Sequence, residues 1–313
     1  MSSEHGGSAP FDDGKDYCIC GELSQSPDDL CASCEKICPD CGEDKEDSMN
    51  ASCDHCANVN KIHNEDCIET MARMEDNYID LIVTSPPYFN AKEYSKYESV
   101  SEYMKQMRDI FLEAGRVMKE GRMCVVNISP VLVAREKRSK QSYRIPLPYY
   151  FVPMMEDIGF EFLEDIIWEK PEGAAANRNG GFFRSRKPLA YKPNIVTEYI
   201  LVFKKKSNLL IDKYLKNNSL VVDGYERSNI WKIQPQTKSK HPAPFPDEIA
   251  DKLIKYYSYE GDLVYDPFMG SGTTAVSAKM LNRNYIGSEL SGEYCKMINK
   301  RIVSIENKST NKL

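Results

Sequence analysis

The sequence contains no run of about 18 apolar residues, which is the length that a membrane-spanning helix requires. Its N-terminal residues 1–16 lack the basic start and the apolar middle of a secretory signal peptide. No glycine-rich segment ends in Gly-Lys-Ser or Gly-Lys-Thr, so the phosphate-binding P-loop is absent as well. These absences exclude a membrane protein and a P-loop nucleotidase, and they predict a protein that stays in the cytoplasm.

Charge is unevenly distributed along a chain whose composition, 41% hydrophobic and 28% charged, is typical of a globular protein. Residues 1–60 hold 14 Asp and Glu against 3 Lys and Arg, whereas residues 131–240 hold 20 Lys and Arg against 12 Asp and Glu. The net charge of −6 therefore conceals a basic middle region, which we interpret as facing nucleic-acid phosphates. The alternative interpretation is that both regions are solvated surface.

Cysteine is concentrated at residues 17–58, which hold eight of the 11 cysteines in four close pairs. Three pairs have the C-x-x-C spacing that brings two thiolates to one tetrahedral ion, and the first pair is C-x-C. Because few apolar residues lie between the pairs, we expect a zinc module with two structural Zn²⁺ ions, paired in sequence or in an interleaved cross-brace. A redox dithiol or unliganded thiols are the alternatives. The expected ligands are Cys18, Cys20, Cys31, Cys34, Cys38, Cys41, Cys53 and Cys56.

The rest of the chain alternates between apolar runs typical of strands and segments with helical spacing. The Glu120-Gly121 pair is interpreted as the stop of the first helix. This alternation predicts an α/β fold with a largely parallel sheet. Strands are predicted at 79–83, 122–129, 162–170 and 197–206, helices at 101–119 and 246–257, and a strand, glycine-rich turn, helix and strand within 262–290.

The glycine-rich segment DPFMGSGTT, residues 266–274, follows a predicted strand and opens a predicted helix, where parallel sheets bind ligands. Gly270 and Gly272 allow a tight turn and a close approach of the backbone to a ligand. The turn is neither a P-loop nor a full G-x-G-x-x-G fingerprint, which favours a nucleoside ligand without phosphates. After the next strand, Glu289 is placed to accept hydrogen bonds from two ribose hydroxyls. A plain tight turn is the alternative.

The same segment resembles the S-adenosylmethionine-binding motif of the amino-methyltransferases that act on DNA. Upstream, HPAPFP at residues 241–246 resembles that family's second cofactor segment, which lies against the methionine end of the cofactor. The resemblance also implies that Asp66, before the catalytic strand, packs on the adenine of the cofactor. The cofactor contacts that it implies are Asp66, Pro244, Phe245, Asp266, Phe268, Gly270, Gly272, Thr273 and Glu289.

The segment TSPPY, residues 84–88, follows another predicted strand, and its chemistry fits the methylation of an amine. An exocyclic amine on a base is a poor nucleophile because its lone pair is delocalised into the ring. Acceptors on its N–H groups, here the Ser85 hydroxyl oxygen and the Pro86 carbonyl, make the lone pair available to an electrophilic methyl group. Pro86 and Pro87 rigidify the turn, and Tyr88 can stack on a base flipped out of the duplex. The alternative is a purely structural turn.

Together these motifs resemble the β-class (permuted) DNA amino-methyltransferases, in which the catalytic motif precedes the cofactor motif. The resemblance covers about residues 61–305 and implies a Rossmann-like methyltransferase fold. A carbon-5 cytosine methyltransferase would need a Pro-Cys nucleophile, and none of the 11 cysteines directly follows a proline. The expected organisation is a disordered acidic tail at 1–16, the zinc module at 17–58 and a methyltransferase domain at 59–308, with a catalytic half at 59–205, a target-recognition segment at about 206–240 and a cofactor-binding half at 241–308.

Basic and aromatic residues supply the remaining candidates. In the family the sequence-reading region precedes the HPAPFP segment, so we expect residues 206–240 to read DNA, aided by 131–147 and 171–193. Phe89 is a second candidate for stacking on the base, and Trp168 is interpreted as a core residue rather than a substrate contact. A long basic loop can clamp phosphates or read guanine edges, with a solvated loop as the alternative. Its candidates are Arg178, Arg184, Arg186 and Lys187.

The resemblance implies transfer of a methyl group from S-adenosylmethionine to cytosine N4 in DNA, because Ser-Pro-Pro-Tyr resembles the cytosine-N4 members and Asp-Pro-Pro-Tyr is commoner among adenine-N6 members. Adenine N6 as target, an RNA substrate and a non-catalytic zinc-containing DNA-binding or regulatory protein are the alternatives. Double-stranded DNA is the expected partner, in a nucleoid-associated setting. A cognate restriction enzyme, another protein at the zinc module and a second copy of the chain are further expected partners.

Overall fold

The computed structural model describes residues 59–89, 97–135, 137, 140, 142–174, 193–207, 225–236 and 246–310. Residues 60–313 form one compact unit. The expected acidic tail and zinc module, residues 1–58, lie outside the described residues.

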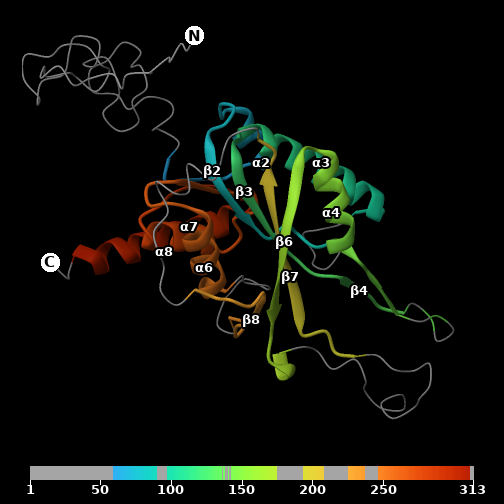
Figure 1. Ribbon diagram of the computed structural model, residues 1–313. Helices are drawn as coiled ribbons and strands as arrows, with labels where there is room; N and C mark the ends of the chain where they lie inside the picture. The colour runs from blue at the N-terminus through green and yellow to red at the C-terminus, as the bar shows by residue number, and fades with distance from the viewer. Residues whose placement is uncertain are drawn as a thin grey trace, which may run out of the picture. The chain divides into compact units, whose positions relative to one another are not determined.

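The unit is built on a sheet of eight described strands (Figure 1). Five neighbouring pairs of strands are parallel, and β7 is antiparallel to both of its neighbours, β3 and β6. This arrangement confirms the predicted α/β fold with a largely parallel sheet. In spatial order the strands are β1 (Lys61–His63), β10 (Asn284–Ser288), β9 (Leu263–Asp266), β2 (Ile79–Thr84), β3 (Met118–Ile128), β7 (Thr197–Lys205), β6 (Phe160–Glu169) and β8 (Ile230–Lys232).

The strand order reverses between β9 and β2 at the centre of the sheet. From β9 the chain continues outward to β10, and from β2 it continues in the opposite direction to β3. At such a switch point the connections leave toward opposite faces, so a crevice opens beyond the carboxyl ends of the two strands. The loops after β9 and β2 are the two motif segments, 266–274 and 84–88. The topology therefore places both motifs at one crevice.

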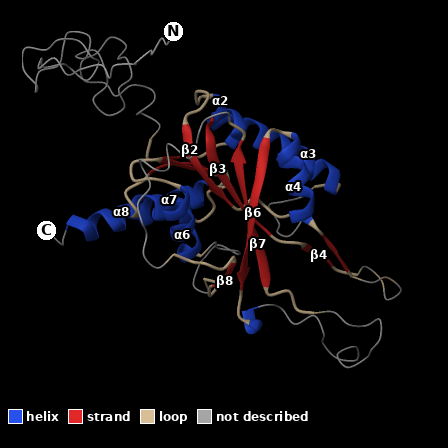
Figure 2. Cartoon of the chain, viewed as in Figure 1, coloured by secondary structure: helices blue, strands red, loops and turns tan. Residues whose placement is uncertain are grey.

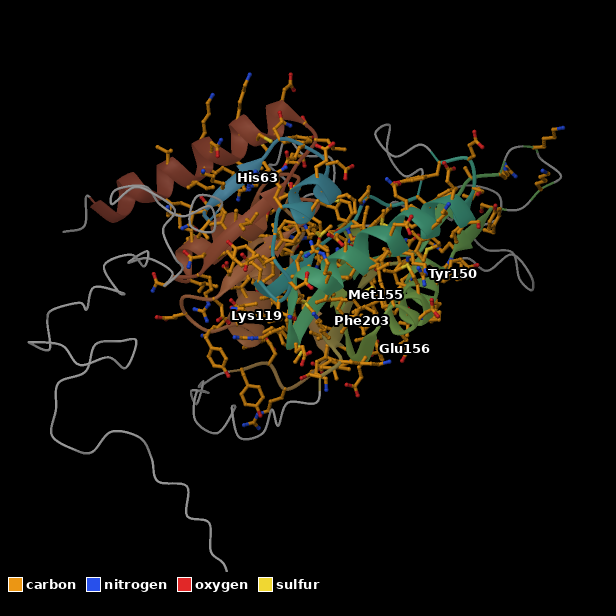
Figure 3. The ribbon with its side chains drawn as sticks, turned by 90° about the horizontal axis from the view of Figure 1, so that it is seen from above. His63, Lys119, Tyr150, Met155, Glu156 and Phe203 are labelled. Carbon is orange, nitrogen blue, oxygen red and sulfur yellow. The ribbon has the colours of Figure 1, made fainter. Side chains whose placement is uncertain are left out.

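Helices cover both faces of the sheet (Figure 2). One layer holds α2 (Cys67–Ala72), α3 (Val100–Val117) and α4 (Leu147–Asp157), and the other holds α6 (Asp247–Tyr257), α7 (Thr273–Met280) and α8 (Gly292–Thr310). Met155 of α4 and Phe203 of β7 are fully buried where that helix covers the sheet, whereas Tyr150 of the same helix is exposed (Figure 3). The other described elements are a hairpin of β4 (Val131–Val133) with β5 (Tyr143–Ile145) and a short 3-10 turn, η2 (Glu172–Ala174).

Burial explains why the central strands were recognisable in the sequence. All six residues of β2, IDLIVT, are buried because this strand lies at the centre of the sheet between two helix layers. On α3 the apolar positions follow helical spacing and face the sheet, and Ser99 caps the helix by accepting a hydrogen bond from the Glu102 N–H at 3.1 Å.

The predicted boundary between the helix at 101–119 and the strand at 122–129 was wrong. The helix ends at Val117, and β3 begins at Met118 without a loop. Gly121, interpreted as part of a helix stop, has φ of 72° inside β3, where the pairing register with β2 shifts between Ile79 and Leu81. Glycine is needed here for an irregularity of the strand, a role that its position in the sequence does not distinguish from a helix stop.

Candidate active site

One cavity of about 1260 Å³ lies at the carboxyl ends of β9, β10, β2 and β3. Its wall joins residues of the two motif segments, although about 180 positions separate them in the sequence. Ten of the residues singled out from the sequence line it: Asp66, Ser85, Pro86, Pro87, Tyr88, Asp266, Phe268, Gly270, Thr273 and Glu289.

Asp266 ends β9 and holds the glycine-rich turn to the end of β2. Its carboxylate accepts hydrogen bonds from the hydroxyls of Thr84, at 2.6 Å, and Thr274, at 2.8 Å, and from the Phe268 N–H at 3.0 Å. Burial raises the pKa of this carboxyl to about 6. The three hydrogen-bond donors lower the pKa, but burial has the larger effect. Asp266 therefore ties the end of β2 to the start of α7.

Glu289 follows β10 and closes the same turn from the other side. One carboxylate oxygen accepts from the Gly270 N–H at 2.8 Å, and the other accepts from the Ser291 N–H at 2.7 Å. Burial raises the pKa of Glu289, and these two backbone donors lower it. The carboxylate lines the cavity with lone pairs to spare, so it is able to accept further hydrogen bonds there.

Gly272 makes the tight turn expected from the sequence, but a contact with α8 takes the place of the expected close approach to a ligand. It has φ of 79° and starts α7, and it does not line the cavity. A Cβ at this position would lie 2.7 Å from the side chain of Ile298 on α8. The left-handed backbone and the packing of α7 on α8 thus require glycine at 272, whereas Gly270, with φ of 54°, does line the cavity.

Asp66 is the N-cap of α2 and accepts a hydrogen bond from the Ile68 N–H at 2.8 Å. It lines the cavity at the cofactor motif's side together with Glu65 and Cys67. The local sequence explains this position, since an aspartate directly before a short helix satisfies its first free N–H groups.

In the turn after β2, residues 84–88, Ser85 is oriented by the backbone of β3. Its hydroxyl donates to the main-chain oxygen of Asn127 at 3.2 Å, and the Asn127 amide nitrogen donates to the Ser85 oxygen at 3.4 Å. Because the serine proton is directed to β3, the remaining lone pair on the oxygen is available as an acceptor for a group in the cavity. Pro86 and Pro87 carry no N–H, so the turn offers carbonyl oxygens without competing backbone donors.

Tyr88 is anchored by a residue that the sequence analysis did not single out. Its hydroxyl donates to Glu198 of β7 at 2.8 Å, and the Asn127 amide donates to the same carboxylate oxygen at 2.9 Å. Lys170, directly after β6, forms an ion pair with the other oxygen of Glu198. All four side chains line the cavity. The sequence held only weak signals for these residues. Asn127 is a polar residue near the end of an apolar strand, and Glu198 is a carboxylate at the start of another strand.

Phe89 and Trp168, the two other aromatic candidates from the sequence, differ in whether they line the cavity. Phe89 packs against Tyr97 and Tyr103, with ring centroids 6.2 and 6.0 Å away, and does not line the cavity, whereas Tyr97 does. Phe89 is thus engaged in an aromatic cluster under α3. Trp168 is 3% exposed, which confirms its assignment to the core, but it also lines the cavity, and its indole N–H donates to the Ile233 carbonyl.

Several singled-out residues lie outside the described residues: Pro244, Phe245, Arg178, Arg184, Arg186, Lys187 and the eight cysteines from Cys18 to Cys56. Within the described ranges no helix is long and apolar enough to cross a membrane. The same ranges contain no group of three or more His, Cys, Asp or Glu side chains arranged to hold a metal ion.

The family model N6_N4_Mtase, described as DNA methylase, matches residues 79–300 of this chain. The chain belongs to this DNA methylase family. The matched range contains the turn after β2, the glycine-rich turn after β9 and Glu289, all of which contribute to the lining of the cavity.

Individual members of the family support this membership. The chain is 34% identical over 262 residues to the orphan methyltransferase M.BamHII of Bacillus amyloliquefaciens, covering 72% of this chain and 89% of that protein. It is 32% identical over 251 residues to the type II beta methyltransferase M.BslI of Bacillus sp. strain NEB-606, covering 77% of this chain but only 27% of that protein.

The fold is that of a solved structure with bound cofactor. TTHA0409 of Thermus thermophilus, crystallised in complex with S-adenosyl-L-methionine, superposes with a TM-score of 0.61 at 25% identity and covers 77% of this chain and 92% of that one. The mostly parallel α/β sheet of this family member is therefore the sheet of a methyltransferase fold.

Proposed function

We propose that this protein transfers a methyl group from S-adenosylmethionine to the exocyclic amino group of a base in DNA. The observation that carries the proposal is the single cavity at the switch point, which is lined by both the Asp266–Thr274 turn and the Ser85–Tyr88 turn. A reaction between a bound nucleoside cofactor and a base needs these two sites next to each other and open to the same space.

The residues of the cavity fit S-adenosylmethionine. Glu289 offers an acceptor for ribose hydroxyls, Phe268 offers an apolar ring, and the segment 266–274 contains no lysine or arginine that would favour a phosphate. Asp66 borders the side proposed for the adenine, and Pro244 and Phe245 are proposed for the methionine end. When bound, this cofactor supplies an electrophilic methyl group on a sulfonium sulfur.

The chain's own residues activate the target amine. Ser85, with its proton directed to the Asn127 carbonyl, accepts a hydrogen bond from one N–H, and the Pro86 carbonyl accepts from the other. Both bonds favour pyramidal nitrogen and free its lone pair. Tyr88 stacks on the flipped base and holds it at the end of the cavity opposite Glu289. In the transfer, the nitrogen lone pair would form the N–C bond as the S–C bond of the sulfonium breaks, and the electron pair of that bond would leave the cofactor as a neutral thioether. The methylated nitrogen would then lose its proton to solvent, and no covalent intermediate with the protein is required.

We infer cytosine N4 as the target, with adenine N6 as the second candidate. The support is the serine at position 85, since Ser-Pro-Pro-Tyr resembles the cytosine-N4 members of the family. A serine hydroxyl and an aspartate both accept from an amine, so the reaction itself allows either base.

We further propose that DNA lies along the carboxyl edge of the sheet. The β4–β5 hairpin follows β3 only a few residues after Asn127, so it lies at that edge. Arg135, Lys137 and Lys140 are exposed on it, as phosphate contacts require. Residues 206–240 and the basic residues Arg178, Arg184, Arg186 and Lys187 are proposed to complete the DNA-facing surface.

The test is incubation of the full chain with S-adenosylmethionine and genomic DNA that lacks modification, followed by mass spectrometry of the nucleosides. We expect N4-methylcytosine with wild type and none with Ser85→Ala, whose cofactor binding stays normal in a calorimetric titration. N6-methyladenine would correct the target base and leave the chemistry intact. Bound cofactor without any methylated deoxynucleoside would contradict the proposal and favour RNA or a regulatory role.

We propose that the N-terminal module at residues 17–58 is a structural element that binds two Zn²⁺ ions through its eight cysteines. We also propose that the catalytic half of the methyltransferase domain precedes its cofactor-binding half in the chain. Cysteine pairs at C-x-x-C spacing support the zinc module. Elemental analysis of purified protein is expected to give two zinc ions per chain, and none after the eight cysteines are replaced by serine. A metal-free wild-type chain with titratable thiols would overturn this assignment.

A further inference from the structure

Glu198 is the centre of the polar contacts at the target end of the cavity. One of its carboxylate oxygens accepts from two donors, the Tyr88 hydroxyl at 2.8 Å and the Asn127 amide at 2.9 Å, and the other pairs with Lys170. The donors come from different strands, because Tyr88 follows β2, Asn127 belongs to β3 and Lys170 follows β6. A single side chain of β7 therefore ties three neighbouring segments together at the reaction centre.

Both donors to this oxygen are adjacent to Ser85. The Asn127 amide is 3.4 Å from the Ser85 oxygen, and Tyr88 belongs to the same turn as Ser85. Burial and the neighbouring Glu198 raise the pKa of Tyr88, so its hydroxyl remains protonated and continues to donate. Tyr88 and Asn127 thus share one carboxylate acceptor, and the Asn127 amide also donates to the Tyr88 oxygen at 3.3 Å.

The arrangement is not the one that stability alone favours. The oxygen of the Asn127 amide is buried and has no hydrogen-bond partner among the described residues. A buried acceptor without a partner costs free energy, and such groups in folded proteins often serve a functional site. Lys170 also lies over the ring of Trp168, 4.4 Å from its centroid, so the network extends to a second aromatic wall of the cavity.

We propose that Glu198, held by Lys170, is a positioning residue that sets the tyrosine ring and the Ser85–Asn127 contact for the target base. This inference rests on the proposed function, because it assigns Tyr88 to stacking on that base. Glu198 acts through Tyr88 and Asn127 and does not itself contact the reacting amine. Losing it removes the shared acceptor of the Tyr88 hydroxyl and the Asn127 amide and loosens both, while the turn around Glu289 keeps its own hydrogen bonds.

The chain offers a matched control for an ordinary ion pair between the same two strands. Lys204 of β7 and Glu161 of β6 form an ion pair at 2.7 Å. This pair links the same two strands as the Lys170–Glu198 pair, but neither Lys204 nor Glu161 lines the cavity. Glu161→Gln removes a cross-strand carboxylate pair without touching the proposed network. We expect this variant to keep wild-type kcat, KM and cofactor affinity.

The experiment measures kcat, KM for DNA and cofactor Kd with methyl-labelled S-adenosylmethionine and unmodified genomic DNA. We expect Glu198→Ala to lower kcat by about 10- to 100-fold, since a displacement near 1 Å at a reacting centre has an effect of that size, with Kd changed by less than about twofold. Glu198→Gln keeps a carbonyl acceptor for Tyr88 and is expected to lose less activity than Glu198→Ala.

A double-variant comparison separates positioning from loss of structure. Tyr88→Phe keeps the ring and removes the hydroxyl that donates to Glu198 and accepts from the Asn127 amide, and we expect kcat to fall by about three- to tenfold. If Glu198 acts through Tyr88, adding Tyr88→Phe to Glu198→Ala lowers kcat little further. Wild-type kcat in Tyr88→Phe or in Glu198→Ala, or effects that simply multiply in the double variant, would overturn the inference.

Two further measurements distinguish a folding defect from a failure of the proposed function. Melting temperatures identify a Glu198→Ala chain that does not fold, in which case Tyr88→Phe and Glu198→Gln carry the test. A wild-type protein that binds cofactor but methylates no DNA contradicts the proposed function. Wild-type turnover that is unchanged in Glu198→Ala contradicts only the role of Glu198.

Discussion

The two ends of the cavity are built in different ways. At the end proposed for the cofactor, here called the cofactor end, Asp266 accepts from Thr274, eight positions away, and Glu289 accepts from Gly270, nineteen positions away. At the end proposed for the target base, here called the target end, Tyr88 reaches Glu198 across 110 positions and Asn127 reaches Glu198 across 71. The first end is nearly contained in one strand-turn-helix-strand segment, and the second is assembled from four strands.

Because of this difference, we expect the two ends to affect different kinetic and binding constants. Most hydrogen bonds that hold the glycine-rich turn are local to residues 266–291, and Thr84 adds one long-range hydrogen bond to Asp266. The target end instead depends on the register of β2, β3, β7 and β6, so small shifts there change the placement of the base. Variants at the cofactor end are expected to change Kd, and variants at the target end are expected to change kcat.

The largest effect that tests this comparison is expected from Glu289→Ala. The change leaves the N–H groups of Gly270 and Ser291 without their acceptor and removes the proposed ribose contact. We expect cofactor binding about 100-fold weaker, close to 3 kcal/mol, measured by isothermal titration calorimetry. Glu260→Ala, an exposed carboxylate before β9, is the control with unchanged Kd. Normal affinity in Glu289→Ala would remove this residue from the cofactor site.

Gly272→Ala tests whether this glycine serves packing or the ligand. Its φ of 79° and the 2.7 Å approach of an added Cβ to Ile298 predict a loss of about 2 kcal/mol in the free energy of unfolding of the cofactor-free protein. Chemical denaturation measures it, and Gly173→Ala, with no neighbouring atom within 4 Å of the added Cβ, is the control. Unchanged stability with weakened cofactor binding would restore the ligand interpretation.

Asp266→Asn tests the buried carboxyl through the pH dependence of stability. The folded-state pKa of about 6 lies above the unfolded value near 3.9, so folding favours the protonated form. The contribution of protonated Asp266 to stability is complete below about pH 4 and is lost as the pH rises through 6. We therefore expect the wild-type free energy of unfolding to fall by about 1 to 2 kcal/mol between pH 4 and pH 6. Glu289 contributes in the same direction in both proteins, so the difference isolates Asp266. Parallel pH curves from denaturant unfolding would refute the shift.

The smallest effect is expected from Lys137→Ala on the β4–β5 hairpin. Loss of one phosphate contact should weaken DNA binding a few-fold and reduce the slope of log K against log salt by about 1. Fluorescence anisotropy over a salt series measures both. Lys255→Ala is the control, because α6 leads into the start of β9 and so ends at the opposite edge of the sheet. Equal slopes for the two variants would exclude the hairpin from the DNA-facing surface.

Much of the cofactor end was predictable because its information is local. The segment 266–274, the strands around it and Glu289 carry their turn chemistry and hydrophobic pattern within a short window. The turn 84–88 was singled out because its motif resembles that of the family and because two prolines after a buried strand restrict its conformation; its catalytic role stays a prediction. The fold class followed from the alternation of such segments.

The rest required the tertiary structure. The sequence identifies a strand at 197–206, but only its antiparallel pairing between β3 and β6 brings Glu198 to Tyr88 and Lys170. Helix α4 and the β4–β5 hairpin were not predicted, and Gly121 and Gly272 were assigned roles that long-range contacts changed. The sequence by itself determined the chemistry available in each short segment. The sheet order decided which of these segments meet, because strand pairing joins residues whose separation along the chain carries no local signal.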